Sequence, residues 1–72
     1  MSPLEILSFL SARNASIQIF RLAEPYILDG ERWSVRFEVE HKAAMLSTKS
    51  RAATMDEAIL AAWSDLSPFL QH

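Results

Sequence analysis

The clearest periodic signal in the chain is a strict alternation of apolar and polar residues over residues 32–40. Trp33, Val35, Phe37 and Val39 alternate with arginine, serine and glutamate residues. Successive side chains of a strand point to opposite faces of its sheet. The pattern therefore predicts an antiparallel strand with one buried and one solvated face.

Two further segments have the composition of strands. Residues 16–22 are rich in β-branched and aromatic side chains, but their apolar residues fall on both faces. Residues 44–52 alternate less strictly, and we expect Lys49 and Arg51 on their outer face. There both cations are placed to meet two glutamates of the neighbouring strand.

Capping residues predict a short helix at the beginning of the chain. Ser2 is a favourable N-cap, a proline follows it, and Glu5 lies three residues after it. This combination is a capping box with proline in the first helical position. Asn14 is suited to the left-handed conformation that ends helices, so we expect the helix over residues 3–13.

A second capping box begins a longer helix near the end of the chain. Thr54 is followed three residues later by Glu57, and the segment beyond them is apolar at helical spacing. We expect Pro68 to end this helix, and Phe69 and Leu70 to pack back on the core. The predicted apolar stripe comprises Met55, Ala58, Ile59, Ala62, Trp63 and Leu66.

An Asp-Gly pair at residues 29–30 is the strongest turn signal in the chain, and its glycine is the only one. We expect this glycine to adopt a positive φ in a two-residue hairpin turn. That turn would set Phe20 and Leu22 on the core face of the sheet. Ile17 and Ile19 would then lie on the outer face.

Together these elements predict an α+β fold, a two-layer sandwich in the order α-β-β-β-α. Both helices are expected on one face of a three-stranded antiparallel sheet. Trp33 and Trp63 are expected to pack on each other between the two layers. At this length, residues 1–72 are expected to form a single domain.

Composition narrows the class of protein. The chain of 72 residues is 50% hydrophobic with a net charge of -2, which is too apolar for a disordered segment. Without cysteine it has neither disulfides nor a thiolate zinc site. We find no basic leader and no membrane-spanning apolar run, and expect a cytoplasmic protein.

The chemistry-bearing residues do not point to an enzyme. Neither His41 nor His72 has the neighbours of a catalytic triad or a metal site. Asp56 and Glu57 are accounted for by helix capping, and a single glycine excludes the glycine-rich phosphate-binding loops. We therefore expect no catalytic residue, no metal and no cofactor.

Binding is the function that remains. A domain this small gains stability by burying apolar groups in a homodimer or against a partner protein. The candidate binding residues form three groups: apolar residues of the predicted loop, isoleucines of the predicted outer sheet face, and cations of that same face. These are Tyr26, Ile27 and Leu28; Ile17 and Ile19; and Arg36, Lys49 and Arg51.

The predicted order of elements is similar to that of the double-stranded-RNA-binding domain over the whole chain. That family carries a basic cluster at the start of its second helix, which contacts phosphates. This chain has Met55, Asp56 and Glu57 at the matching place. The sign of the charge is reversed, so nucleic acid is the less favoured partner, and an RNA-binding module remains an alternative.

Two other resemblances favour a protein partner. The step Thr54-Met55-Asp56-Glu57-Ala58 resembles the strand-to-helix junction of HicB-type antitoxins, which implies an antitoxin-like partner of a toxin. The small size and the regular, capped elements are similar to phage and prophage accessory proteins, including anti-CRISPR inhibitors. That resemblance implies a non-catalytic inhibitor that binds and occludes a host protein complex.

Overall fold

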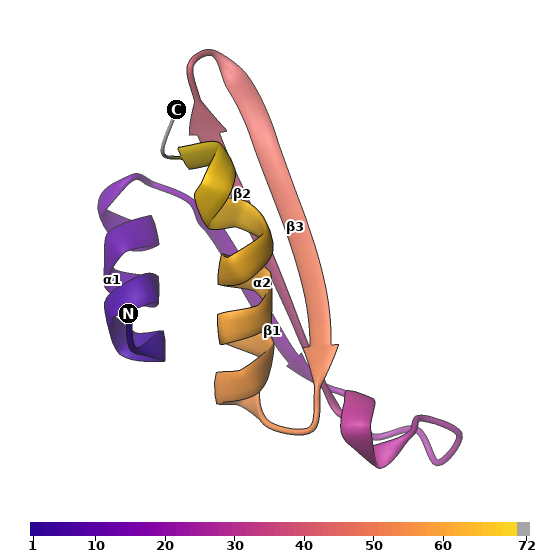
Figure 1. The fold of residues 1–72 in the computed structure, drawn as a ribbon. Helices are drawn as coiled ribbons and strands as arrows, with labels where there is room; N and C mark the ends of the chain where they lie inside the picture. Colours follow the sequence, from indigo (N-terminus) through magenta and orange to yellow (C-terminus); the bar gives the residue numbers. More distant parts are fainter. Residues whose placement is uncertain (71–72) are drawn as a thin grey trace.

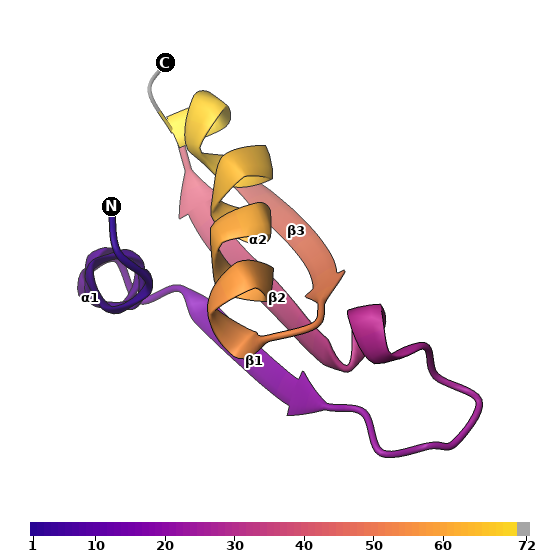
Figure 2. The ribbon, with the colours of Figure 1, turned by 60° about the horizontal axis from the view of Figure 1, so that its bottom comes forward.

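The two α-helices and the three strands form close to where the sequence pattern predicts them. The computed structural model describes residues 1–70, and its elements are α1 (Pro3–Ala12), β1 (Ser16–Arg21), the short 3-10 helix η1 (Asp29–Glu31), β2 (Trp33–His41), β3 (Ala44–Ala52) and α2 (Met55–Leu70). The strands form one antiparallel sheet with β2 in the centre. Figure 1 and Figure 2 show both helices on the same face of this sheet. The predicted α+β class and element order are therefore confirmed.

Reciprocal capping begins α1. The Ser2 hydroxyl accepts a hydrogen bond from the Glu5 backbone N–H at 3.2 Å, and the Glu5 carboxylate accepts one from the Ser2 N–H at 3.2 Å. The Ser2 backbone bond, followed by the Ser2 hydroxyl bond, holds the pKa of Glu5 below its ordinary value. Asn14 follows the helix with a φ of 57°, the left-handed conformation expected of it.

Helix α2 begins as predicted but continues further. The Thr54 hydroxyl accepts a hydrogen bond from the Glu57 backbone N–H at 3.2 Å. The expectation that Pro68 ends the helix is wrong, because Pro68 lies inside it. Leu70 packs against the core and so keeps the last turn on the sheet. Proline removes a single helix hydrogen bond, to Ser64, which lies on the exposed side of the helix.

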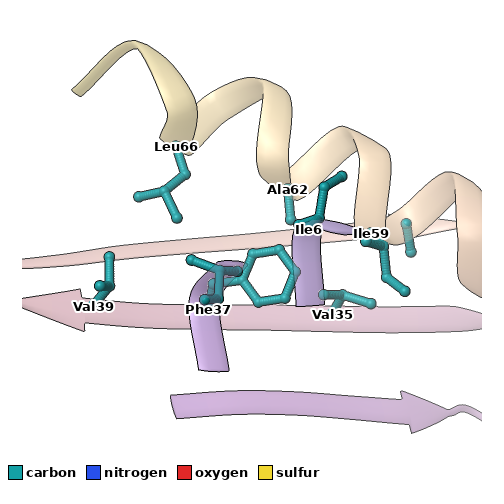
Figure 3. Packing of buried hydrophobic residues seen from close by; sticks show 9 residues of the cluster. Ile6, Val35, Phe37, Val39, Ile59, Ala62 and Leu66 are labelled. Atoms are coloured by element: carbon teal, nitrogen blue, oxygen red, sulfur yellow. The ribbon is translucent and has the colours of Figure 1, made fainter. Parts of the chain in front are cut away.

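The core lies between the inner face of β2 and the two helices. Val35, Phe37 and Val39 are buried, and Figure 3 shows them directed at the side chains of α2. The predicted meeting of a period-two face with a helical stripe is thus confirmed, except that Met55 of the stripe is exposed and Trp63 is half-buried. The buried cluster comprises Ile6, Leu10, Val35, Phe37, Val39, Ala58, Ile59, Ala62 and Leu66.

An aromatic contact joins the two helices. The rings of Phe9 and Trp63 meet edge to face with centroids 5.4 Å apart, and the Arg13 guanidinium lies 4.3 Å from the centre of the Phe9 ring. The aromatic partner of Trp63 is therefore Phe9 of α1. The expectation that Trp63 packs on Trp33 is wrong. Trp33 is half-buried and packs against the core from the beginning of β2.

The register of the first hairpin differs from the expected one. Ile17 lies opposite Phe37 and Ile19 opposite Val35, so both isoleucines face the core and pack against it. Phe20 lies on the outer face and is exposed. The expectation that the isoleucines occupy the outer face is therefore wrong.

The connection at residues 22–32 explains this difference. Residues 29–30 belong to η1 and form no two-residue turn, and Gly30 does not have a positive φ. The Leu22 N–H donates to the Arg32 carbonyl at 2.7 Å, so Leu22 faces Arg32 and not Phe37. The pairing is displaced by an odd number of residues, which moves each side chain of β1 to the other face.

The second hairpin has the two-residue turn that the first one lacks. Lys42 and Ala43 have φ values of 51° and 63°, as a type I′ turn requires at both central positions. From this turn β2 and β3 pair without a break to the far end of the sheet. Leu46 and Thr48 face inward and are half-buried, which confirms the predicted alternation of β3.

Candidate functional site

The loop of residues 22–32 is held by one arginine. The Arg32 guanidinium donates to the carbonyl of Glu24 at 2.8 Å and to that of Leu22 at 3.3 Å, and it forms an ion pair with Asp29 at 3.3 Å. The Arg32 side chain is mostly covered, at 23% exposure. One guanidinium thus connects the beginning of the loop to its end.

The loop presents two large apolar side chains to solvent. Tyr26 is 79% exposed and Leu28 is 70% exposed, whereas Ile27 between them is half-buried. Backbone hydrogen bonds from the Ile27 N–H to the Glu24 carbonyl and from the Glu31 N–H to the Leu28 carbonyl shape the tip. Figure 1 shows that the loop projects beyond the end of the sheet, away from both helices. Of the three predicted loop residues, two are therefore accessible.

The three predicted cations do share the outer sheet face. Lys49 lies directly opposite Arg36, and Arg51 lies opposite Ser34. The expected cross-strand pairing with glutamates is wrong, because Glu38 and Glu40 lie opposite Ser47 and Met45. Glu38 instead forms an ion pair with Arg36 of its own strand, at 3.4 Å. This end of the face is therefore locally cationic, and the like charges of Lys49 and Arg36 directly opposite each other destabilise the sheet.

A groove that the sequence did not reveal lies between β3 and the end of α2. Its volume is about 340 Å³. Met45 and Phe69 are 64% and 62% exposed beside it, so Phe69 does not pack back on the core as expected. The alternation within β3 placed Met45 on the outer face, but nothing in the sequence joins it to Phe69. The lining residues are Met45, Leu46, Ser47, Thr48, Asp65, Leu66 and Phe69.

Titratable side chains form no metal-binding group in the described part of the chain. His41 is half-buried at the end of β2, and His72 lies outside the described residues. Asp56 and Glu57 both lie in the first turn of α2, where negative charge is favourable. No helix within residues 1–70 is long and apolar enough to span a membrane.

Comparison with known proteins yields no match to a protein family, to a curated protein or to a solved structure.

Proposed function

We propose that this chain is a non-catalytic module that binds another protein through the loop of residues 22–32. The observation that carries the proposal is the pair of exposed apolar side chains, Tyr26 and Leu28, on a loop fixed by the Arg32 guanidinium. Tyrosine and other large side chains contribute most of the energy of protein interfaces. An ordered loop also loses little conformational entropy on binding.

The charges around the tip define the chemistry of the partner. Glu24, Asp29 and Glu31 are exposed around Tyr26 and Leu28, and within residues 1–70 only Asp29 of these three forms an ion pair. A partner complementary to this loop has an apolar pocket with a basic rim. Such surfaces are typical of proteins that bind nucleic acid, since contacts to phosphates need lysine and arginine.

An inhibitor that occludes a host protein complex is the role we propose for such a module. It needs no catalytic group, and an acidic, apolar loop is suited to covering a basic binding surface. The resemblance to small phage proteins of the anti-CRISPR kind supports this role, and an antitoxin would use the same surface against its toxin. The RNA-binding alternative is less favourable, because Asp56 and Glu57 place negative charge at the start of α2.

The experiment compares matched variants in affinity capture from the cells that naturally contain the chain. Leu28→Ser and Tyr26→Ser should each weaken capture of the partner at least about tenfold, as expected for residues worth about 2 kcal/mol. Leu4→Ser is the control, because Leu4 is also a leucine, 75% exposed, and lies on α1.

Circular dichroism must show that all three variants remain folded. Unchanged capture by both loop variants would refute the proposal. Binding of the wild-type chain to duplex RNA with a steep salt dependence would favour the RNA-binding alternative instead.

A further inference from the structure

The outer edge of β3 carries a row of backbone groups that no strand of the sheet satisfies. In a two-residue hairpin the residues that flank the turn exchange both hydrogen bonds, and every second pair repeats this. His41 and Ala44 flank the turn, so the even-numbered residues of β3 bond to β2. The odd-numbered residues Met45, Ser47, Lys49 and Arg51 therefore direct their N–H and carbonyl groups to the free edge.

This edge lacks most of the devices that protect edge strands. Natural edges are kept short, bulged, covered or interrupted by proline, or they carry charged side chains. Of these devices β3 has two charged side chains, Lys49 and Arg51, on its outer face. β3 extends over Ala44–Ala52 without a proline, and its pairing with β2 has no bulge. The other edge strand, β1 (Ser16–Arg21), is shorter, and Figure 2 shows α1 beside it. In both views η1 lies beside the last residues of β3, and no other described element lies along this edge.

The free backbone groups are symmetric about one residue. Met45 and Arg51 lie equally far from Thr48, as do Ser47 and Lys49. We infer that two copies of this chain associate through antiparallel pairing of their β3 strands about a two-fold axis at Thr48, which forms one continuous six-stranded sheet. In this register the four free residues of each copy pair fully, with about eight backbone hydrogen bonds.

Charge complementarity selects a second copy as the occupant of this edge. On the outer face of one copy, Lys49 and Arg51 occupy one end, whereas Glu38 and Glu40 lie beside Ser47 and Met45 at the other end. Antiparallel pairing places Lys49 opposite Ser47 of the second copy. Glu38 of the second copy lies on the next strand, β2, directly beside that small serine. Arg51 likewise approaches the Glu40 of the second copy across Met45.

The same pairing relieves a repulsion within each chain. Lys49 lies directly opposite Arg36, which forms an ion pair with Glu38 of its own strand. In the dimer Lys49 gains a carboxylate from the second copy, which offsets that repulsion.

The helix layer fits this arrangement. In the dimer the two α2 helices lie side by side and antiparallel on the core face. Phe69 and Met45 border the groove and are exposed in the single chain. Phe69 comes to the end of the second copy where its α2 begins, with Met55 38% exposed. Apolar burial at this seam adds to the strand pairing.

The first test measures the mass of the full chain by sedimentation over a range of concentrations. The wild-type chain should be a dimer at about 200 µM, and dilution should dissociate it. Ser47→Pro removes one free-edge N–H per copy and should raise the dimer Kd at least about tenfold. Arg21→Pro is the matched control, because the Arg21 N–H faces the free edge of β1, and its Kd should be unchanged.

A second test fixes the register without relying on proline. The chain contains no cysteine, so Thr48→Cys introduces a single thiol on the proposed axis. Residues paired there have Cα atoms about 4.5 Å apart, within the range of a disulfide. Oxidation should give a covalent dimer from Thr48→Cys and not from Gln18→Cys on β1.

Charge reversal tests the complementarity directly. Lys49→Glu should weaken the dimer, and the addition of Glu38→Lys should restore it. A wild-type monomer at about 200 µM overturns the proposal, as does a dimer that Ser47→Pro leaves intact and Thr48→Cys does not trap. A monomer whose β3 edge instead captures an extended peptide would also overturn it.

The dimer and the proposed binding loop are independent. Leu28→Ser should leave the dimer intact, and Ser47→Pro should leave the loop unchanged. Failure of one proposal can therefore be distinguished from failure of the other.

Discussion

Truncation of Phe37 is the most direct test of the core. Phe37 is fully buried at the centre of β2, with Ile17 and Thr48 opposite it on the two neighbouring strands. Figure 3 shows its ring directed at the helix layer, near Ala62 of α2. Phe37→Ala therefore leaves a cavity enclosed on all sides, which its neighbours cannot easily fill.

The expected loss is comparable with the whole stability of the domain. A buried phenylalanine removes about 150–250 Å² from water, worth about 4–6 kcal/mol at about 25 cal/mol per Å². Alanine keeps part of this contact, so the expected cost is about 3–5 kcal/mol. A single core in so small a chain supplies about 3–5 kcal/mol, and we expect Phe37→Ala to be largely unfolded at 25 °C.

Thermal and urea unfolding followed by circular dichroism measure this loss at one fixed protein concentration. Phe37→Leu should lower the free energy of unfolding by about 1 kcal/mol, a Tm decrease of about 4–8 °C for this chain length. Phe20→Ala is the matched control on the outer face, where Phe20 is 54% exposed. The reasoning is refuted if Phe37→Ala melts within a few degrees of the wild type.

Four further predictions concern local features. Ala43→Gly should raise the free energy of unfolding by about 0.5–1 kcal/mol, because alanine is strained at a φ of 63°. Gly30→Ala should raise it by about 0.4–1 kcal/mol, because a Cβ there meets nothing within 4 Å and φ is not positive; a lower Tm in urea or thermal unfolding would contradict either one. Ile19→Ala should destabilise the chain more than Phe20→Ala in the same assay, because Ile19 packs against the core and Phe20 is exposed. The opposite order would support the register that a two-residue turn at residues 29–30 predicts. Folding lowers the pKa of Glu5 below its ordinary value of 4.5, so its stabilising effect is complete above that pH and lost as the pH falls through the folded-state pKa. Glu5→Gln should therefore reduce the loss of Tm on acidification, and an unchanged Tm profile would argue against the cap.

Some of the candidate surfaces could be predicted from the sequence, and one could not. Alternation within β2 and β3 correctly placed Arg36, Lys49 and Arg51 on one face, since it depends only on the two-residue period of a strand. Exposure of Tyr26 and Leu28 could be predicted because no period explained their burial. The groove at Phe69 could not, since it forms where the end of α2 meets a strand distant in sequence.

Local signals determined the elements of this protein. The capping boxes at Ser2 and Thr54 and the alternation of β2 act over a few residues, so each element could be located before its neighbours were known. The tertiary structure decided the register of β1, because that register depends on how the whole loop of residues 22–32 folds around Arg32. It also decided that α2 passes Pro68, because packing of Leu70 on the core compensates for a lost hydrogen bond. In both cases the conformation is stabilised by contacts between residues far apart in sequence, and a local sequence pattern cannot predict such contacts.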